Sequence, residues 1–176
     1  MKRIGVIVGA LVVAAPVAFA ATDPRLAGVR EQASRMGEAM VRGDDTVMAD
    51  MTYSKVVEMN GGREKMLAAI ATSRKAMAAD GTSFAKVEIG EPGAAIAGGS
   101  SLFTVIPETL TLTVKGGRLL QESFLLGISS DNGATWTFLD GAGLARFPDK
   151  IPELLPDLPT GTALPTVTRP VFVPAN

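Results

Sequence analysis

Apolar residues recur at helical spacing through the first part of the chain. The first such segment begins at Asp23-Pro24, a capping side chain followed by proline in the first turn, and ends at Gly43. Asp44 can cap a short second helix directly behind it. The pattern therefore predicts two helices and leaves the stretch from Tyr53 to Met59 open between helix and extended chain.

A third predicted helix lies between two glycine breaks. It follows Gly61-Gly62 and ends before Gly81. One stripe of this helix consists of Met66, Ile70, Ser73 and Met77. Methionine packs irregular gaps well, so we interpret the methionines of the helical stripes as core filler rather than as a binding surface.

The period of the pattern changes to two after Gly81, as in β-strands. The predicted strands span residues 84–89, 101–106, 109–114, 118–129 and 135–140. Two tight turns, at Gly116-Gly117 and at Asp131-Asn132-Gly133, make the last three strands antiparallel neighbours. Helices followed by antiparallel strands predict an α+β fold with the helices covering one face of the sheet.

Prolines are concentrated at the end of the chain. From Phe147 onward they stand at positions 148, 152, 156, 159, 165, 170 and 174. Because this density rules out helix and central strand, we expect an extended tail whose leucines, such as Leu154 and Leu158, pack its first part on the body. We place one domain at residues 21–158 and a Pro-rich, mobile tail at residues 159–176. A Pro-rich ligand for a partner protein is the alternative.

The first twenty residues have the pattern of a cleavable signal peptide. Lys2-Arg3 forms a basic start, residues 4–19 carry no charge, and Ala18-Phe19-Ala20 is an A-x-A site. An uncleaved anchor is the alternative, but a spanning helix needs about 20 apolar residues. The chain has no cysteine to carry a lipid. We expect a periplasmic or secreted protein without a membrane anchor after cleavage.

Composition excludes several kinds of chemistry. The formal net charge is −1, and loss of the two basic residues of the leader makes it more negative, so no basic patch for nucleic acid is expected. The absence of histidine removes the usual base near neutral pH, and the absence of cysteine removes thiol nucleophiles and the usual zinc sites. The acids show no calcium-loop spacing. We therefore expect no metal and no cofactor.

Carboxylate or lysine acid–base chemistry remains open. Glu122 shares strand parity with an otherwise apolar set of residues, Leu120, Phe124, Leu126 and Ile128. If that face is buried, loss of solvent raises the pKa of Glu122 and tunes it as a base. We favour the alternative that Glu122 turns to solvent or pairs with Arg118 or Arg63. Tyr53 is the only tyrosine that could assist it.

Residues 129–136 fit the Asp-box pattern S-x-D-x-G-x-T-W of sialidase-type β-propellers. A propeller needs four to eight blades, and this chain contains a single copy. We interpret the motif as a hairpin device, in which Asp131 binds backbone donors, Gly133 supplies positive φ, and Trp136 packs beneath the turn.

Five segments together resemble exported bacterial proteins of the NTF2-like (ketosteroid-isomerase-like) superfamily. They are residues 53–57, 61–66, 103–107, 123–129 and 131–138, within a likeness that covers roughly residues 25–158. The resemblance implies helices packed on a strongly curved antiparallel sheet, with the mouth of a cone between them. This scaffold serves isomerases, dehydratases, cyclases and binding proteins alike, so it does not decide the activity.

We expect a non-enzymatic protein that holds a small apolar ligand or a protein partner in this cone. The candidate ligand-binding residues are Tyr53, Phe103, Glu122, Phe124 and Trp136. The alternative is an isomerase or lyase that uses Glu122 as its carboxylate base together with Tyr53. NTF2-like domains often dimerise through the outer sheet face, and the threonines of the segment 109–113 could form such a homodimer.

Overall fold

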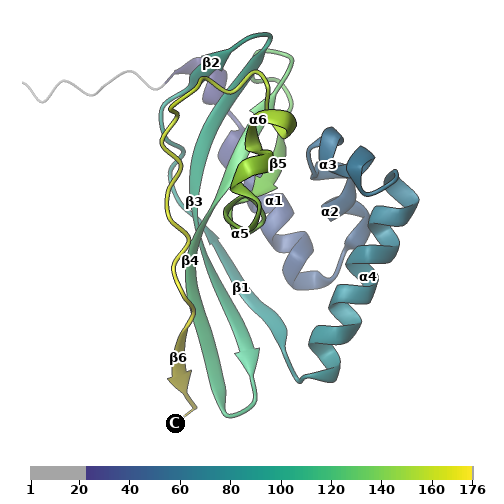
Figure 1. Ribbon diagram of the computed structural model, residues 1–176. Helices are drawn as coiled ribbons and strands as arrows, with labels where there is room; N and C mark the ends of the chain where they lie inside the picture. The colour runs from purple at the N-terminus through teal and green to yellow at the C-terminus, as the bar shows by residue number, and fades with distance from the viewer. Residues whose placement is uncertain (1–22, 176) are drawn as a thin grey trace, which may run out of the picture.

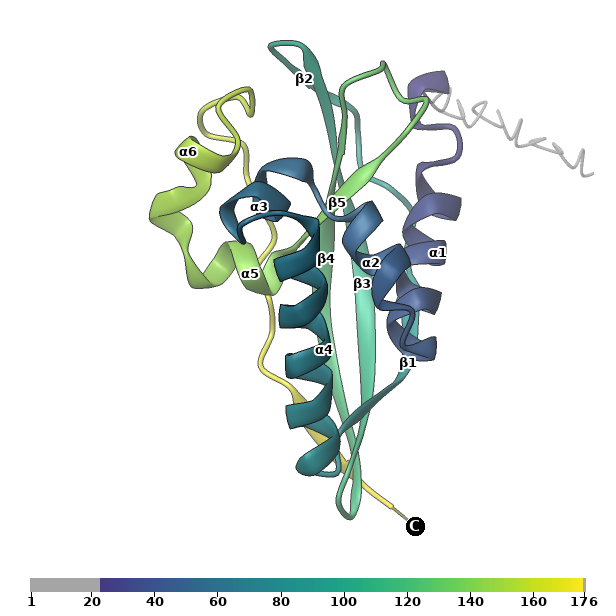
Figure 2. The ribbon, with the colours of Figure 1, turned by 90° about the vertical axis from the view of Figure 1, so that its right-hand side faces the viewer.

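The structure, a computed structural model, describes residues 23–175. The expected signal peptide therefore lies outside the described residues. The described chain forms helices first and an antiparallel sheet second, which confirms the predicted α+β class (Figures 1 and 2). The helical part comprises η1 (Pro24–Leu26), α1 (Val29–Arg42), α2 (Asp45–Met51), α3 (Ser54–Met59) and α4 (Arg63–Ala79).

The helix boundaries follow local capping. Gly43 ends α1 in the left-handed conformation, with φ 78°, as glycine readily does. The carboxylate of Asp44 accepts a hydrogen bond of 3.1 Å from the backbone N–H of Val47 and so caps α2. The open stretch behind Tyr53 is helical, as α3. The predictions of the second and third helices are thus confirmed. The first predicted helix ends at Gly43 as expected, but Asp23-Pro24 begins the short helix η1, and α1 starts only at Val29, because Gly28 takes the left-handed conformation and interrupts the segment.

The sheet is built around one long hairpin. Its strands are β1 (Ser83–Ile89), β2 (Ile96–Gly98), β3 (Ser101–Val114), β4 (Gly117–Ser129), β5 (Thr137–Asp140) and β6 (Val171–Pro174). The order is β1-β3-β4-β5; β2 pairs with β3 and β6 pairs with β4, and all of these pairs are antiparallel. The central hairpin β3–β4 pairs from Leu102 with Ser129 to Val114 with Gly117.

β3 is one continuous strand where the sequence predicts two, at residues 101–106 and 109–114. The carbonyl of Pro107 accepts a hydrogen bond of 2.8 Å from Gly90, on the side of β3 away from β4. The N–H that proline lacks would point to this same side, where β1 has already ended at Ile89. The strand therefore passes through Pro107 without losing a bond to its partner strand.

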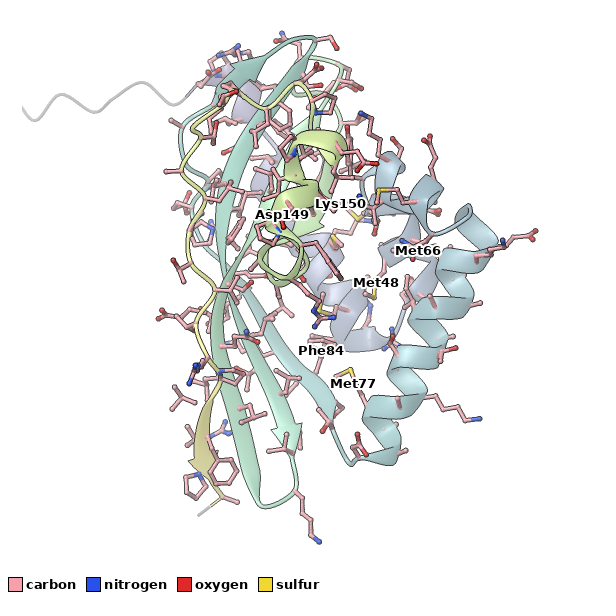
Figure 3. The ribbon with its side chains drawn as sticks, in the orientation of Figure 1. Met48, Met66, Met77, Phe84, Asp149 and Lys150 are labelled. Atoms are coloured by element: carbon pink, nitrogen blue, oxygen red, sulfur yellow. The ribbon has the colours of Figure 1, made fainter. Side chains whose placement is uncertain are left out.

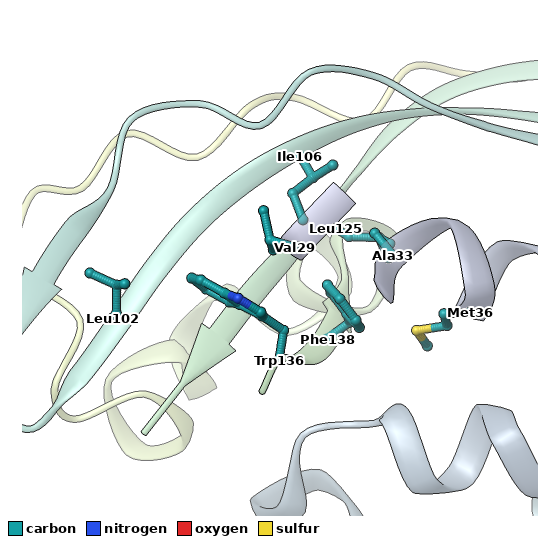
Figure 4. Close-up of a cluster of buried hydrophobic side chains, with 8 residues drawn as sticks. All are labelled: Val29, Ala33, Met36, Leu102, Ile106, Leu125, Trp136 and Phe138. Atoms are coloured by element: carbon teal, nitrogen blue, oxygen red, sulfur yellow. The ribbon is translucent and has the colours of Figure 1, made fainter. Parts of the chain in front are cut away.

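Two buried clusters cover opposite faces of the sheet. The first lies beneath α1 and contains Val29, Ala33, Met36, Leu102, Ile106, Leu125, Trp136 and Phe138 (Figure 4). The second contains Phe103, Phe124, Leu126, Ile128 and Leu139, together with Leu144, Leu154 and Leu155. Neighbouring residues of β4 alternate between the clusters, because successive side chains of a strand point to opposite faces.

The Pro-rich end of the chain differs from a free tail. It follows α5 (Gly141–Arg146) and begins with η2 (Pro148–Lys150) and α6 (Ile151–Leu154). Helix was excluded for this region, but α6 forms because Pro152 stands in its first turn, where no N–H is needed. The chain then follows the sheet on the face away from α4 (Figure 1) and pairs with β4 as β6. As a short edge strand, β6 tolerates its proline.

The Asp-box segment forms a hydrogen-bonded turn. Asp131 accepts bonds from the backbone N–H and the hydroxyl of Thr135, at 2.9 and 2.6 Å, and the hydroxyl of Ser129 donates to it at 2.7 Å. These bonds hold the pKa of Asp131 down at about 2. The indole N–H of Trp136 donates to the carbonyl of Gly133 at 3.0 Å. These contacts support the interpretation of the motif as a hairpin device.

Candidate functional site: an apolar cleft beneath helix α4

Helix α4 stands away from the sheet. None of its seventeen residues is buried, although its stripe of Met66, Ile70 and Met77 is apolar and half-buried. An amphipathic helix normally buries such a stripe against its neighbours. Here the stripe lines a cleft between α4, the other helices and β1. The ribbon views show α4 as the helix farthest from the sheet (Figures 1 and 2).

This space is an open cleft of about 460 Å³. Its apolar walls come from α1, α2, α4 and β1: Met40, Val41, Met48, Met66, Ala69, Ile70, Met77, Ala78 and Phe84. Figure 3 shows Met48, Met66, Met77 and Phe84 between α4 and the sheet. The volume falls within the range of roughly 300–1,000 Å³ that is usual for small-molecule sites.

The methionines of the helical stripes mostly line this cleft and do not form the closed core that the sequence predicts. Of the methionines on these stripes, only Met36 of α1 is buried, at 7% exposure, in the first cluster. Met40, Met48, Met66 and Met77 are half-buried around the cleft. Flexible, polarisable thioethers can fit ligands of different shapes, so these methionines make the cleft adaptable.

Few polar groups reach the cleft. They are the side chains of Asn60, Ser73, Arg74, Thr82 and Ser83. Arg74 pairs with Asp45 of α2, and its Nε lies 3.0 Å from Oδ1 of that carboxylate. Its Nη1 lies 3.5 Å from the carbonyl of Met40, and its Nη2 lies 3.7 Å from the sulfur of Met48. Arg74, the one cation among the described residues of the lining, is thus held by contacts to α1 and α2.

The five candidate ligand-binding residues of the sequence analysis do not line this cleft. Phe103 and Phe124 are buried in the second cluster, and Trp136 is buried in the first. Tyr53 is half-buried beside the second cluster, and Glu122 is exposed. The structure therefore brings Tyr53, Phe103 and Phe124 together at the second cluster and places Trp136 in the first cluster, on the other face of the sheet.

Glu122 and Tyr53 differ in environment. Glu122 turns to solvent, because β4 extends there beyond the cover of the second cluster and the neighbouring Leu120 is exposed as well. Its backbone N–H donates a hydrogen bond to the hydroxyl of Thr168, and its carbonyl accepts one from the backbone N–H of Thr168. Burial raises the pKa of Tyr53 above 10, and Asp157 and Glu58 add to the shift. The solvent-facing alternative for Glu122 is thus confirmed.

Glu108 is a buried acid that the sequence analysis missed. Its side chain is 4% exposed, and neither its Oε2 nor the hydroxyl of Ser123, which pairs with it across the hairpin, has a hydrogen-bond partner among the described residues. Loss of solvent, with a smaller contribution from Asp140, raises the pKa of Glu108 from 4.5 to about 7, and the nearby hydroxyl of Ser123 opposes part of this rise. Glu108 does not line the cleft.

The signal for Glu108 was present in the sequence but depended on strand continuity. In an unbroken β3, Glu108 shares parity with Ile106 and Leu110, which are both buried. Because the sequence predicts a break around Pro107, Glu108 falls between two predicted strands. Strand alternation therefore could not assign its side chain to a face of the sheet.

The expected homodimer surface lies on the face of the sheet opposite the cleft. Thr109, Thr111 and Thr113 share that face with Glu122, whereas Phe84 of the cleft belongs to the other face. The homodimer stays a prediction.

Between residues 23 and 175, no three side chains of the metal-ligating types lie together closely enough to hold an ion. None of the helices in that range has the length and hydrophobicity that a bilayer crossing requires.

Comparisons of the whole chain with protein-family models, curated proteins and solved structures found no match.

Proposed function

We propose that this protein is a non-enzymatic, exported binding protein that holds a small apolar ligand between its helical layer and its sheet. The observation that carries the proposal is the apolar stripe of α4, which faces an open cleft of about 460 Å³ and leaves the helix without a buried residue. Exposed apolar surface costs free energy in water, at roughly 25 cal/mol per Å². A ligand in the cleft would remove part of that surface from water.

The position of the cleft agrees with the cone mouth that the NTF2-like resemblance implies. It lies between the helices and the face of the sheet that carries Phe84. The export part of the proposal rests on the leader pattern of residues 1–20. A catalytic role is not favoured, because Glu122 is exposed and Glu108 is not part of the cleft lining.

A bulky substitution in the cleft tests the proposal. Ala69 lies on the wall formed by α4, so we expect Ala69→Trp to fill the cleft and to weaken binding of a neutral apolar probe at least tenfold. N-phenyl-naphthylamine is a suitable probe because its fluorescence rises in apolar surroundings. Titration of the probe into each protein gives the dissociation constant.

The same helix offers a matched control. Ala71 is exposed and does not line the cleft, so Ala71→Trp should bind the probe like the wild type. If Ala69→Trp also binds like the wild type while remaining folded by circular dichroism, the cleft is not the binding site.

A further inference from the structure

The cleft presents a single charge to its contents, and that charge is positive. Among the described residues that line it, Arg74 is the only charged one; its partner Asp45 lies outside the lining. We propose that the ligand is a fatty-acid-like amphiphile whose apolar chain lies among the methionines and whose carboxylate binds Arg74. This inference rests on the proposed function and specifies the chemistry of its ligand.

The guanidinium of Arg74 retains donors for a second acceptor. Arginine carries five N–H donors. Its Nε and Nη2 both donate to the same oxygen of Asp45, Oδ1. Its Nη1 has only the carbonyl of Met40, at 3.5 Å, which is long for a hydrogen bond. A carboxylate that enters the cleft could therefore bind Nη1 without displacing Asp45.

Arg74 is also held in position before a ligand arrives. Asp45, in the first turn of α2, fixes one edge of the guanidinium. Gly43 makes room for the other edge, because a Cβ atom at this position would lie 2.8 Å from Nη1. Binding to a fixed group loses less conformational entropy than binding to a free side chain. The arrangement favours an anion that arrives at a defined point of the cleft.

The donors of Arg74 favour a carboxylate over other head groups. No acidic side chain lines the cleft within the described residues, so a cationic head group would find no carboxylate to pair with there. Arg74 is about one-third exposed. An apolar ligand without a charged head group would displace water from Arg74 and offer the guanidinium no hydrogen-bond acceptor in return. Arginine and carboxylate form short, charge-assisted hydrogen bonds, which compensate for that loss.

A pair of ligands that differ only in the head group tests the inference. Dodecanoate and dodecanol carry the same alkyl chain, so isothermal titration below their aggregation limits isolates the carboxylate. We expect the wild type to bind dodecanoate about tenfold more tightly than dodecanol. Arg74→Met replaces the guanidinium by an apolar side chain of similar length. This variant should lose the preference, because its affinity for dodecanoate falls while its affinity for dodecanol stays the same.

Asp45→Asn separates an anchoring role of Arg74 from a structural one. It removes the competing carboxylate while keeping the side-chain shape, so dodecanoate should bind this variant at least as tightly as the wild type. If Asp45→Asn and Arg74→Met both weaken the two ligands alike, the ion pair only joins α2 to α4 and the inference is overturned.

The two levels of the proposal fail differently. Equal affinity of the wild type for dodecanoate and dodecanol overturns the carboxylate inference and leaves the apolar cleft standing. If the wild type binds neither compound nor N-phenyl-naphthylamine, the proposed function itself is wrong.

Discussion

Replacing Glu108 by glutamine is expected to stabilise the protein above pH 7 by about 3 kcal/mol and to leave its stability below pH 4.5 nearly unchanged. In the folded state the pKa of this carboxyl is about 7, against 4.5 as the ordinary value. Between these two pH values the unfolded chain has released the proton and the folded chain still holds it, so stability falls as pH rises. Glutamine stays neutral and removes this loss.

The measurement is urea denaturation of the wild type and of Glu108→Gln on both sides of this pH window. The difference between the two proteins cancels the titration of the other acids. Glu122→Gln is the matched control, because it removes an exposed carboxylate from the adjacent strand and should keep the wild-type pH dependence. A constant difference between Glu108→Gln and the wild type across the window would show that Glu108 ionises normally in the folded protein.

Gly133→Ala should destabilise the protein by roughly 3 kcal/mol, through strain in the turn and overlap with the chain beneath it. Gly133 has φ 94°, a region that L-residues rarely adopt. A Cβ atom here would lie 1.9 Å from the backbone oxygen of Arg25, which cannot move without moving η1. The midpoint and slope of a urea transition give the free energy of unfolding.

Gly62→Ala separates the two causes. Gly62 has nearly the same φ, 97°, but no atom lies within 4 Å of the position that its Cβ would take. This variant therefore carries the conformational strain alone and should be the less destabilised of the two. Equal losses in Gly62→Ala and Gly133→Ala would mean that the contact with Arg25 contributes nothing.

The helices were predictable because their signals are local. Gly43 and Asp44 end one helix and begin the next through their own backbone and side-chain bonds, and the structure has both. The continuity of β3 was not predictable in this way. Whether Pro107 interrupts a strand depends on which side its missing N–H faces, and that is decided by β1, which ends at Ile89.

The cleft could not be predicted from periodicity. The stripe of Met66, Ile70 and Met77 indicates that one side of α4 is apolar, but it does not indicate whether another element covers that side. In the same way, Phe103 and Trp136 are inward-facing as expected, but each is enclosed by its own cluster. Parity assigns a side chain to a face of a sheet; it does not show whether that face is filled or hollow.

The most direct test of the binding cleft is the methyl NMR spectrum of the methionines during titration with dodecanoate. The methyl signals of Met40, Met48, Met66 and Met77 should shift together, since these residues surround the cleft. Met36, in the first cluster, and Met59, exposed on α3, should keep their positions. Shifts confined to Met59, or no shift at the four cleft methionines at saturating ligand, would contradict binding in the cleft.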